Sequence, residues 1–107
     1  QHLFNKVTDA FSLSPTSLVA SGGSTRNAAL MDIKANVSGL PIIIPEVDEA
    51  ACLGAALLAG IGAGVYKDFN DAKEQVHYSS TTITFDESAH RIYRKFYKDF
   101  FIKNLYK

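Results

Sequence analysis

The sequence contains no tryptophan, only one cysteine and no excess of either charge. Because Cys52 is alone, an internal disulfide is excluded, which fits the reducing cytoplasm where we expect the protein to be. Eleven basic and eleven acidic side chains balance, so the net charge provides no strong attraction to nucleic acid or to a membrane surface. The three histidines lie far apart and away from any metal-ligand spacing, so no metal site is predicted.

Long apolar runs and secretion signals are also missing. The longest run, residues 50–65, is dominated by alanine and glycine, and it is shorter than the roughly 20 apolar residues that cross a membrane. No basic segment followed by an apolar one opens the chain, so no secretory signal is predicted. A length of 107 residues allows one domain at most. Because the chain starts with Gln1 and not Met, we expect it to continue upstream.

The catalytic motifs that a sequence can reveal are absent. There is no Gly-x4-Gly-Lys-Ser/Thr loop, no nucleophile elbow and no cysteine–histidine catalytic pattern. Asp48 and Glu49 lie at the N-terminal end of a predicted helix, and a favourable interaction with the helix dipole explains them better than catalysis. Asp32 falls inside another predicted helix as a solvated side chain. No residue of this chain is therefore predicted to be catalytic.

The most informative stretch is residues 21–27, Ser-Gly-Gly-Ser-Thr-Arg-Asn. A short apolar strand, residues 17–20, precedes it, and apolar residues at helical spacing follow it over about 26–38. A turn between a strand and a helix aims free backbone N–H groups and the positive end of the helix dipole outwards. An anion, such as a nucleotide phosphate, is the expected ligand. A tight connection with a helix cap and no ligand is the alternative.

Each polar or small residue of this turn has an expected role. Gly22 and Gly23 carry no Cβ, so they allow a sharp turn and the close approach of a ligand. Ser24 or Thr25 is predicted to cap the following helix. Asn27 is predicted to project from the first turn of that helix, where its amide offers both a donor and an acceptor.

Apolar periodicity predicts an α/β fold. Helices are predicted at residues 1–11, 26–38, 47–62, 70–76 and 86–105, strands at 17–20 and 41–45, and an edge strand or extended segment at 81–85. The first two strands and the helix between them form a right-handed crossover. Three successive isoleucines at 42–44 indicate burial on both faces. Without upstream strands this strand would expose an edge, so we expect self-association into a homo-oligomer.

Two helices allow more than one interpretation. Residues 50–60 are nearly all small, which indicates core packing more strongly than ligand contact. The last predicted helix carries an aromatic stripe and a set of lysines and arginines. Residues 91–107 hold six of the eleven basic side chains and one acidic one. The two sets lie on different faces, so a core-packed helix with a solvated side is favoured over nucleic-acid binding.

Three segments in order resemble the C-terminal part of the FGGY carbohydrate kinases. They are the glycine turn at 20–27, Gly-Leu-Pro at 39–41, and Pro-Glu-Val-Asp-Glu-Ala-Ala-Cys-Leu-Gly-Ala-Ala at 45–56. The resemblance covers nearly the whole chain. It implies a ribonuclease H-like ATPase domain of the actin/Hsp70/hexokinase type, with a short sheet flanked by helices. Residues 1–107 would then be a single partial domain, the C-terminal, ATP-binding segment of a sugar kinase.

The resemblance also implies site residues and partners. Gly22, Gly23 and Ser24 would lie against the ATP phosphates and ribose, and Asn27 would contact the adenine. The intact enzyme would use ATP and Mg²⁺. Its catalytic base and most contacts to the sugar or polyol would lie in an upstream N-terminal domain outside these 107 residues. The chain alone is therefore expected to be inactive.

The sequence departs from the family pattern at three positions. Ser24 stands where a third glycine or alanine is frequent, Asn36 stands where aspartate is usual, and Asp32 stands where glutamine is frequent. The departures at Ser24 and Asn36 leave a second hypothesis, a non-catalytic module with the same fold that serves nucleotide sensing or assembly.

Overall fold

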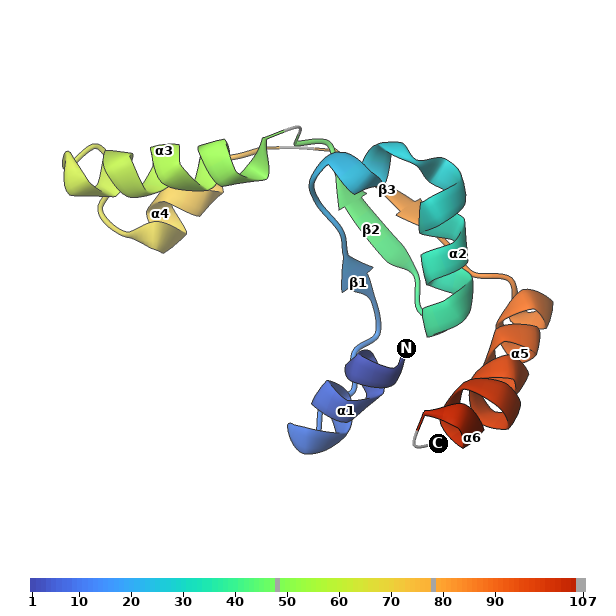
Figure 1. Ribbon diagram of the computed structural model, residues 1–107. Coiled ribbons are helices and arrows are strands. Elements are labelled where there is room, and N and C mark those ends of the chain that lie inside the picture. Colours follow the sequence, from blue (N-terminus) through green and yellow to red (C-terminus); the bar gives the residue numbers. More distant parts are fainter. Residues whose placement is uncertain (48, 78, 106–107) are drawn as a thin grey trace.

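A small three-stranded sheet organises the molecule (Figure 1). The structure, a computed structural model, describes residues 1–47, 49–77 and 79–105. The elements in order are α1 (His2–Ala10), β1 (Leu18–Val19), the 3₁₀ turn η1 (Gly23–Arg26), α2 (Ala28–Ser38), β2 (Ile42–Pro45), α3 (Ala50–Gly62), α4 (Phe69–Glu74), β3 (Ser80–Ile83), α5 (Glu87–Phe96), the π-helical η2 (Tyr97–Phe101) and α6 (Ile102–Asn104). The predicted α/β class is confirmed.

Strand β2 is the centre of the sheet, in the order β1-β2-β3. It pairs in parallel with β1, with Leu18 opposite Ile42, and antiparallel with β3, with Ile42 opposite Ile83. The prediction that residues 42–44 expose an edge is therefore wrong, because β3 pairs with the side that was expected to be open. Among the described residues, the unpaired edges of this sheet belong to the outer sides of β1 and β3.

The core is small and lies between α2 and the sheet. Met31 and Ala35, one helical turn apart on α2, and Ile42 in β2 are fully buried. Ile43, whose side chain points to the opposite face of the sheet from Ile42, is only half-buried, so the predicted burial on both faces of β2 is not reached among the described residues. The described elements cover only part of this sheet, because α3 does not fold back over it (Figure 1).

Helix α2 is defined by a side-chain cap at one end and a glycine at the other. Asn27 is its N-cap, and the Asn27 Oδ1 accepts a hydrogen bond from the Leu30 N–H at 3.0 Å. The prediction that Ser24 or Thr25 caps the helix is therefore wrong, because both residues belong to the separate turn η1. At the other end, Gly39 adopts the left-handed conformation with φ 69°, which is the usual glycine termination of a helix.

The C-terminal end of α2 is clamped to the start of α5. The Asn36 Oδ1 accepts a hydrogen bond from the Asp86 N–H at 2.7 Å, and His90 Nδ1 donates to the Asn36 carbonyl at 2.8 Å. The His90 ring lies against Gly39, 2.5 Å from the position that a Cβ would occupy. Phe85 also packs against this ring in an edge-to-face arrangement, with ring centroids 5.6 Å apart. Only glycine therefore fits at position 39.

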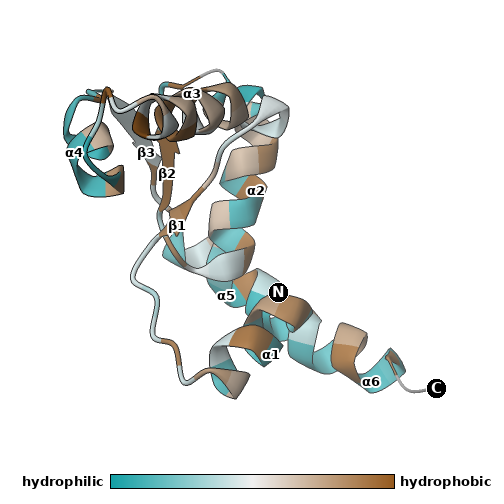
Figure 2. Cartoon of the chain, turned by 90° about the vertical axis from the view of Figure 1, so that its left-hand side faces the viewer, coloured by the Kyte–Doolittle hydropathy of each residue, from teal (hydrophilic) through white to brown (hydrophobic). Residues whose placement is uncertain are grey.

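Helices α3 and α4 form an arm that extends away from the sheet (Figure 1). No residue of α3 is buried, and α4 is the element against which it packs. The core packing expected for this small-residue helix is therefore not found among the described residues. Gly60 lies against the Tyr66 ring, whereas nothing lies within 4 Å of a Cβ built at Gly54. Figure 2 shows that much of this exposed helix is hydrophobic. Asp48, expected near its start, lies outside the described residues.

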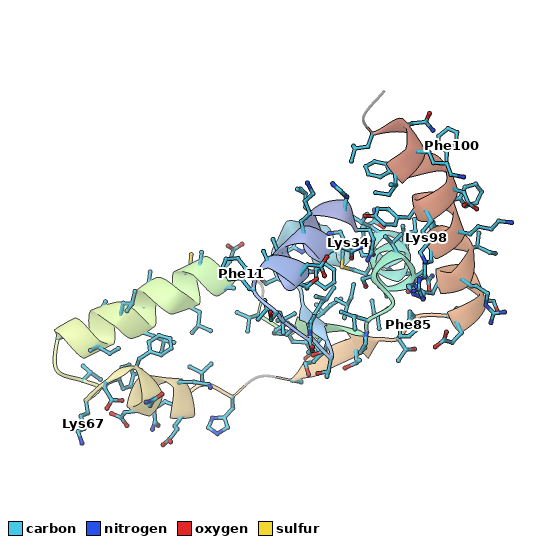
Figure 3. All side chains as sticks on the ribbon, turned by 90° about the horizontal axis from the view of Figure 1, so that it is seen from below. Phe11, Lys34, Lys67, Phe85, Lys98 and Phe100 are labelled. Carbon is cyan, nitrogen blue, oxygen red and sulfur yellow. The ribbon has the colours of Figure 1, made fainter. Side chains whose placement is uncertain are left out.

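The last helix has the predicted extent, but it contains a π-helical segment and much of its apolar face is exposed. The π-helical segment η2 joins α5 to α6 within one continuous helical run. The aromatic stripe was expected to be core-packed, yet Ile92, Phe96 and Phe100 are 57%, 65% and 70% exposed. Figure 3 shows Phe100 on this last helix. Tyr97 and His2 do meet, because the Tyr97 hydroxyl lies 3.0 Å from His2 Nδ1.

The overall dimensions agree with this open packing. The radius of gyration is 17.9 Å, whereas a compact domain of this length has a radius of about 13 Å. The extents are 55 × 29 × 22 Å. None of the helices in the described ranges combines the length and apolar character that crossing a bilayer requires. Most apolar side chains of the chain thus lie outside its own core.

We expect Gly39→Ala to destabilise the chain by more than about 1 kcal/mol, because the left-handed backbone disfavours a Cβ and the His90 ring occupies the space. Gly54→Ala is the matched control, since the same change in open helix should stabilise by up to about 1 kcal/mol. Urea unfolding followed by circular dichroism measures both changes. Equal effects of the two substitutions would contradict the assigned role of Gly39.

Candidate functional site

Two hydrogen bonds to the Gly22 carbonyl close the first part of the glycine turn. Gly22 has φ 92°, a conformation that favours glycine. Its carbonyl accepts a hydrogen bond from the Thr25 N–H at 3.0 Å and a second from the Thr25 hydroxyl at 2.8 Å. The carbonyl is thus held inside the turn. The N–H groups of Gly23 and Ser24 have no acceptor within the described ranges, so they remain available to a ligand.

The turn is open to solvent. Five of its six residues from Gly22 to Asn27 are exposed, and only Thr25 is half-buried. Free N–H groups at an accessible strand-to-helix turn are the geometry that binds anions in many α/β proteins. The local geometry expected from the sequence is therefore present, while the identity of the ligand stays a prediction.

A hollow of about 160 Å³ adjoins this turn. It is lined by Gly22, Thr25 and Arg26 of the turn, by residues 44–47 at the end of β2, and by Thr81 of β3. It lies beyond the carboxyl ends of the two parallel strands, where open α/β sheets bind ligands. Polar and apolar groups both reach it, which suits a ligand with phosphate or hydroxyl groups.

The predicted site residues fall into two groups. Gly22 lines the hollow, whereas Gly23, Ser24 and Asn27 lie on the same exposed turn outside its lining. The Asn27 amide was predicted to offer both a donor and an acceptor. Its Oδ1 is already engaged by the helix cap, so Nδ2 is the group left for a ligand among the described contacts.

Sequence reasoning missed the residues that other elements bring to this hollow. Glu46 follows β2 directly, and its position after a strand was a usable signal. Thr81 comes from the antiparallel strand β3, and its pairing with Ile44 places it here. No local pattern in the sequence connects residue 81 with residue 22.

The departure at Asn36 has a structural explanation. Asn36 lies nine residues beyond Asn27 on α2, about 13 Å along the helix axis. Its side-chain oxygen accepts the Asp86 N–H, a bond that an aspartate oxygen could accept equally well. The change at this position therefore affects the α2–α5 junction and not the glycine turn.

The other side-chain clusters and hollows of the described residues do not form a defined ligand site. No group of three His, Cys, Asp or Glu side chains in residues 1–47, 49–77 and 79–105 could hold a metal ion. Larger hollows lie between α1 and the last helix, about 590 Å³, and between α3 and α4, about 530 Å³. Both are lined mainly by exposed helix faces, so their size reflects open packing and not a defined ligand site.

Comparison with known proteins places the chain in a family. Residues 4–63 match the model of the FGGY family of carbohydrate kinases, C-terminal domain. The chain is 40% identical over 81 residues to L-xylulose/3-keto-L-gulonate kinase of Escherichia coli K12, covering 76% of this chain and 16% of that protein. It is 38% identical over 89 residues to an autoinducer-2 kinase of E. coli ATCC 8739, covering 83% and 17%.

A solved structure agrees with the fold. The crystal structure of ligand-bound xylulose kinase from Lactobacillus acidophilus matches with a TM-score of 0.69 at 19% identity, covering 87% of this chain and 19% of that one. The chain spans about one sixth of the length of the curated relatives named above. The family match extends over more than half of the chain and includes the glycine turn, α2 and β2. The chain therefore belongs to the FGGY family of carbohydrate kinases, as part of the C-terminal domain.

Proposed function

We propose that this chain is the ATP-binding segment of a carbohydrate kinase, which as an intact protein transfers the γ-phosphoryl group of ATP to a sugar or polyol hydroxyl. The observation that carries the proposal is the open glycine turn at the carboxyl ends of β1 and β2, in a chain of the FGGY family. The two relatives are named for different substrates, L-xylulose or 3-keto-L-gulonate and autoinducer-2. The proposal therefore names the acceptor only by its class.

In this proposal the turn binds the nucleotide mainly through its main chain. The Gly23 and Ser24 N–H groups would donate to phosphate oxygens, helped by the positive end of α2. Gly22, Gly23 and Ser24 together would lie against the phosphates and ribose. The Asn27 Nδ2 would donate to a ring nitrogen of the adenine.

Catalysis needs groups that this chain does not supply. Phosphoryl transfer depends on a positioned base and on Mg²⁺ that neutralises charge on the phosphates. In this proposal the ATP phosphates and residues of the upstream domain would hold the ion, and no metal-ligand cluster occurs among the described residues. The base would likewise lie outside the chain. The 107 residues contribute binding and orientation of ATP.

The non-catalytic alternative is less favoured than the kinase. Asn36 serves a junction remote from the turn. Ser24 would bind through its main-chain N–H, which does not depend on the side chain. Neither departure therefore argues against nucleotide binding.

We expect the 107-residue chain alone to give no phosphoryl transfer in a coupled assay with ATP, Mg²⁺ and a panel of sugars and polyols. The intact protein should show turnover with at least one acceptor in the same assay. Turnover by the short chain would contradict the placement of the base outside it. Absence of turnover by an intact protein that binds ATP would favour the non-catalytic module.

Substitutions of Asn27 separate its role in the helix cap from its role in the ligand site. Asn27→Asp keeps a good N-cap and removes the amide donor, so stability should hold while ATP affinity falls about 5- to 10-fold. Asn27→Ala should lower the ATP affinity by the same factor and should also lower the free energy of unfolding by about 1 kcal/mol. Nucleotide titration and urea unfolding of the intact protein measure the two effects. Unchanged ATP affinity in the aspartate variant would contradict the proposed contact between Asn27 and the adenine.

Thr25 is expected to hold the turn in its binding geometry. Thr25→Val deletes the hydroxyl bond to Gly22 and should raise the KM for ATP several-fold, because a hydrogen bond of this kind contributes about 1 kcal/mol. Thr25→Ser retains the hydroxyl and is the matched control, with KM near that of the parent protein. The KM for the sugar should not change in either variant. A rise in both KM values would indicate a general loss of structure.

A further inference from the structure

Among the described residues that line the hollow beside the glycine turn, Glu46 is the one with an acidic side chain, and the fold alone does not explain its role. Glu46 is the first residue after β2, and its backbone N–H donates to the Ser79 carbonyl at 2.9 Å. Its side chain is exposed and lines the same hollow as Gly22 and Thr25. Glu46 therefore lies at the end of the central strand, beside the region where the nucleotide is proposed to bind.

The carboxylate is held by one oxygen and leaves the other available. The Ser79 hydroxyl donates a hydrogen bond to Oε2 of Glu46, from the segment that precedes β3. Across the described ranges, Oε1 of Glu46 has no hydrogen-bond partner. This tether fixes the direction of the side chain without using all its acceptor capacity, because an ionised carboxylate has about four lone-pair sites.

The charge of Glu46 limits what can lie against it. A phosphate group would be repelled by the carboxylate, whereas hydroxyl groups donate hydrogen bonds to it. Phosphate oxygens suit the free N–H groups of the turn. The same part of the sheet edge thus offers donors for an anion and an acceptor for hydroxyls. An acidic side chain that follows a strand and binds ribose hydroxyls is the arrangement used by dinucleotide-binding folds.

We propose that Glu46 binds the ribose hydroxyls of the nucleotide and makes the site selective for ribonucleotides over deoxyribonucleotides. The inference rests on the proposed ATP-binding function and adds a residue and a selectivity to it. Glu46 is a binding residue, since its free oxygen contacts the ribose directly. Its bond to Ser79 sets the orientation of the carboxylate.

The test is titration of the intact protein with ATP, 2′-deoxy-ATP and 3′-deoxy-ATP. The parent protein should prefer ATP over at least one deoxy analogue by about 10-fold, as expected for a hydrogen bond to a charged acceptor. Glu46→Gln should lower that preference about fivefold, because a neutral acceptor makes a weaker bond. Glu46→Ala should reduce it to near one, through weaker ATP binding and unchanged binding of that analogue.

Ser79→Ala is the matched control, because it removes the tether and keeps the carboxylate. It should lower the preference for ATP less than Glu46→Ala does, because the carboxylate remains but is no longer held in one orientation, while thermal unfolding measures the structural cost. Equal weakening of ATP and both deoxy analogues in the Glu46 variants would show a purely structural role and overturn the inference. Unchanged binding of all three nucleotides would also overturn it. An intact parent protein that binds no nucleotide would instead overturn the proposed function.

Discussion

The burial of one face of α2 determines where the glycine turn lies. Met31 and Ala35 are fully buried on this helix, together with Ile42 of the central strand. A small core of this kind leaves little freedom to rotate or slide the helix without exposing these side chains. Because the turn immediately precedes α2, its N–H groups are aimed by the same packing. The proposed nucleotide site is thus a consequence of the core and not of the turn alone.

The two ends of α2 are defined by different physical devices. Asn27 satisfies the Leu30 N–H at the start, and the left-handed Gly39 ends the helix beneath the His90 ring. His90 and Asp86 both bind Asn36, so the last helix is joined to the end of α2 that is remote from the turn. Helix α2 thus connects the candidate site at its start with the helix α5 at its end.

The chain is loosely packed, which is consistent with its matching only a small part of the length of its relatives. Apolar side chains on α1, α3 and α5 remain exposed, and the radius of gyration exceeds that of a compact domain. The matched segments span only 16% and 17% of the two relatives named above. A helix that is apolar on all sides is normally buried, so α3 in particular has the composition of a helix within a larger assembly of elements.

The sequence by itself determined the features that depend on neighbouring residues. The strand–turn–helix unit, the left-handed Gly39 and the order of most elements follow from local periodicity and turn residues, and the family was recognisable from three spaced motifs. Local sequence was less reliable for the helix cap. Ser24, Thr25 and Asn27 are all good capping residues, and only the formation of a separate 3₁₀ turn selected Asn27.

Only the tertiary structure decided which distant residues meet. Strand β3 pairs with the side of β2 that was expected to be open, and this pairing brings Thr81 to the hollow. Ser79, just before β3, hydrogen-bonds to Glu46. The aromatic stripe of the last helix is periodic in the sequence, yet most of it lies open in the structure. Periodicity reports which face of a helix is apolar, whereas burial depends on whether another element lies against that face.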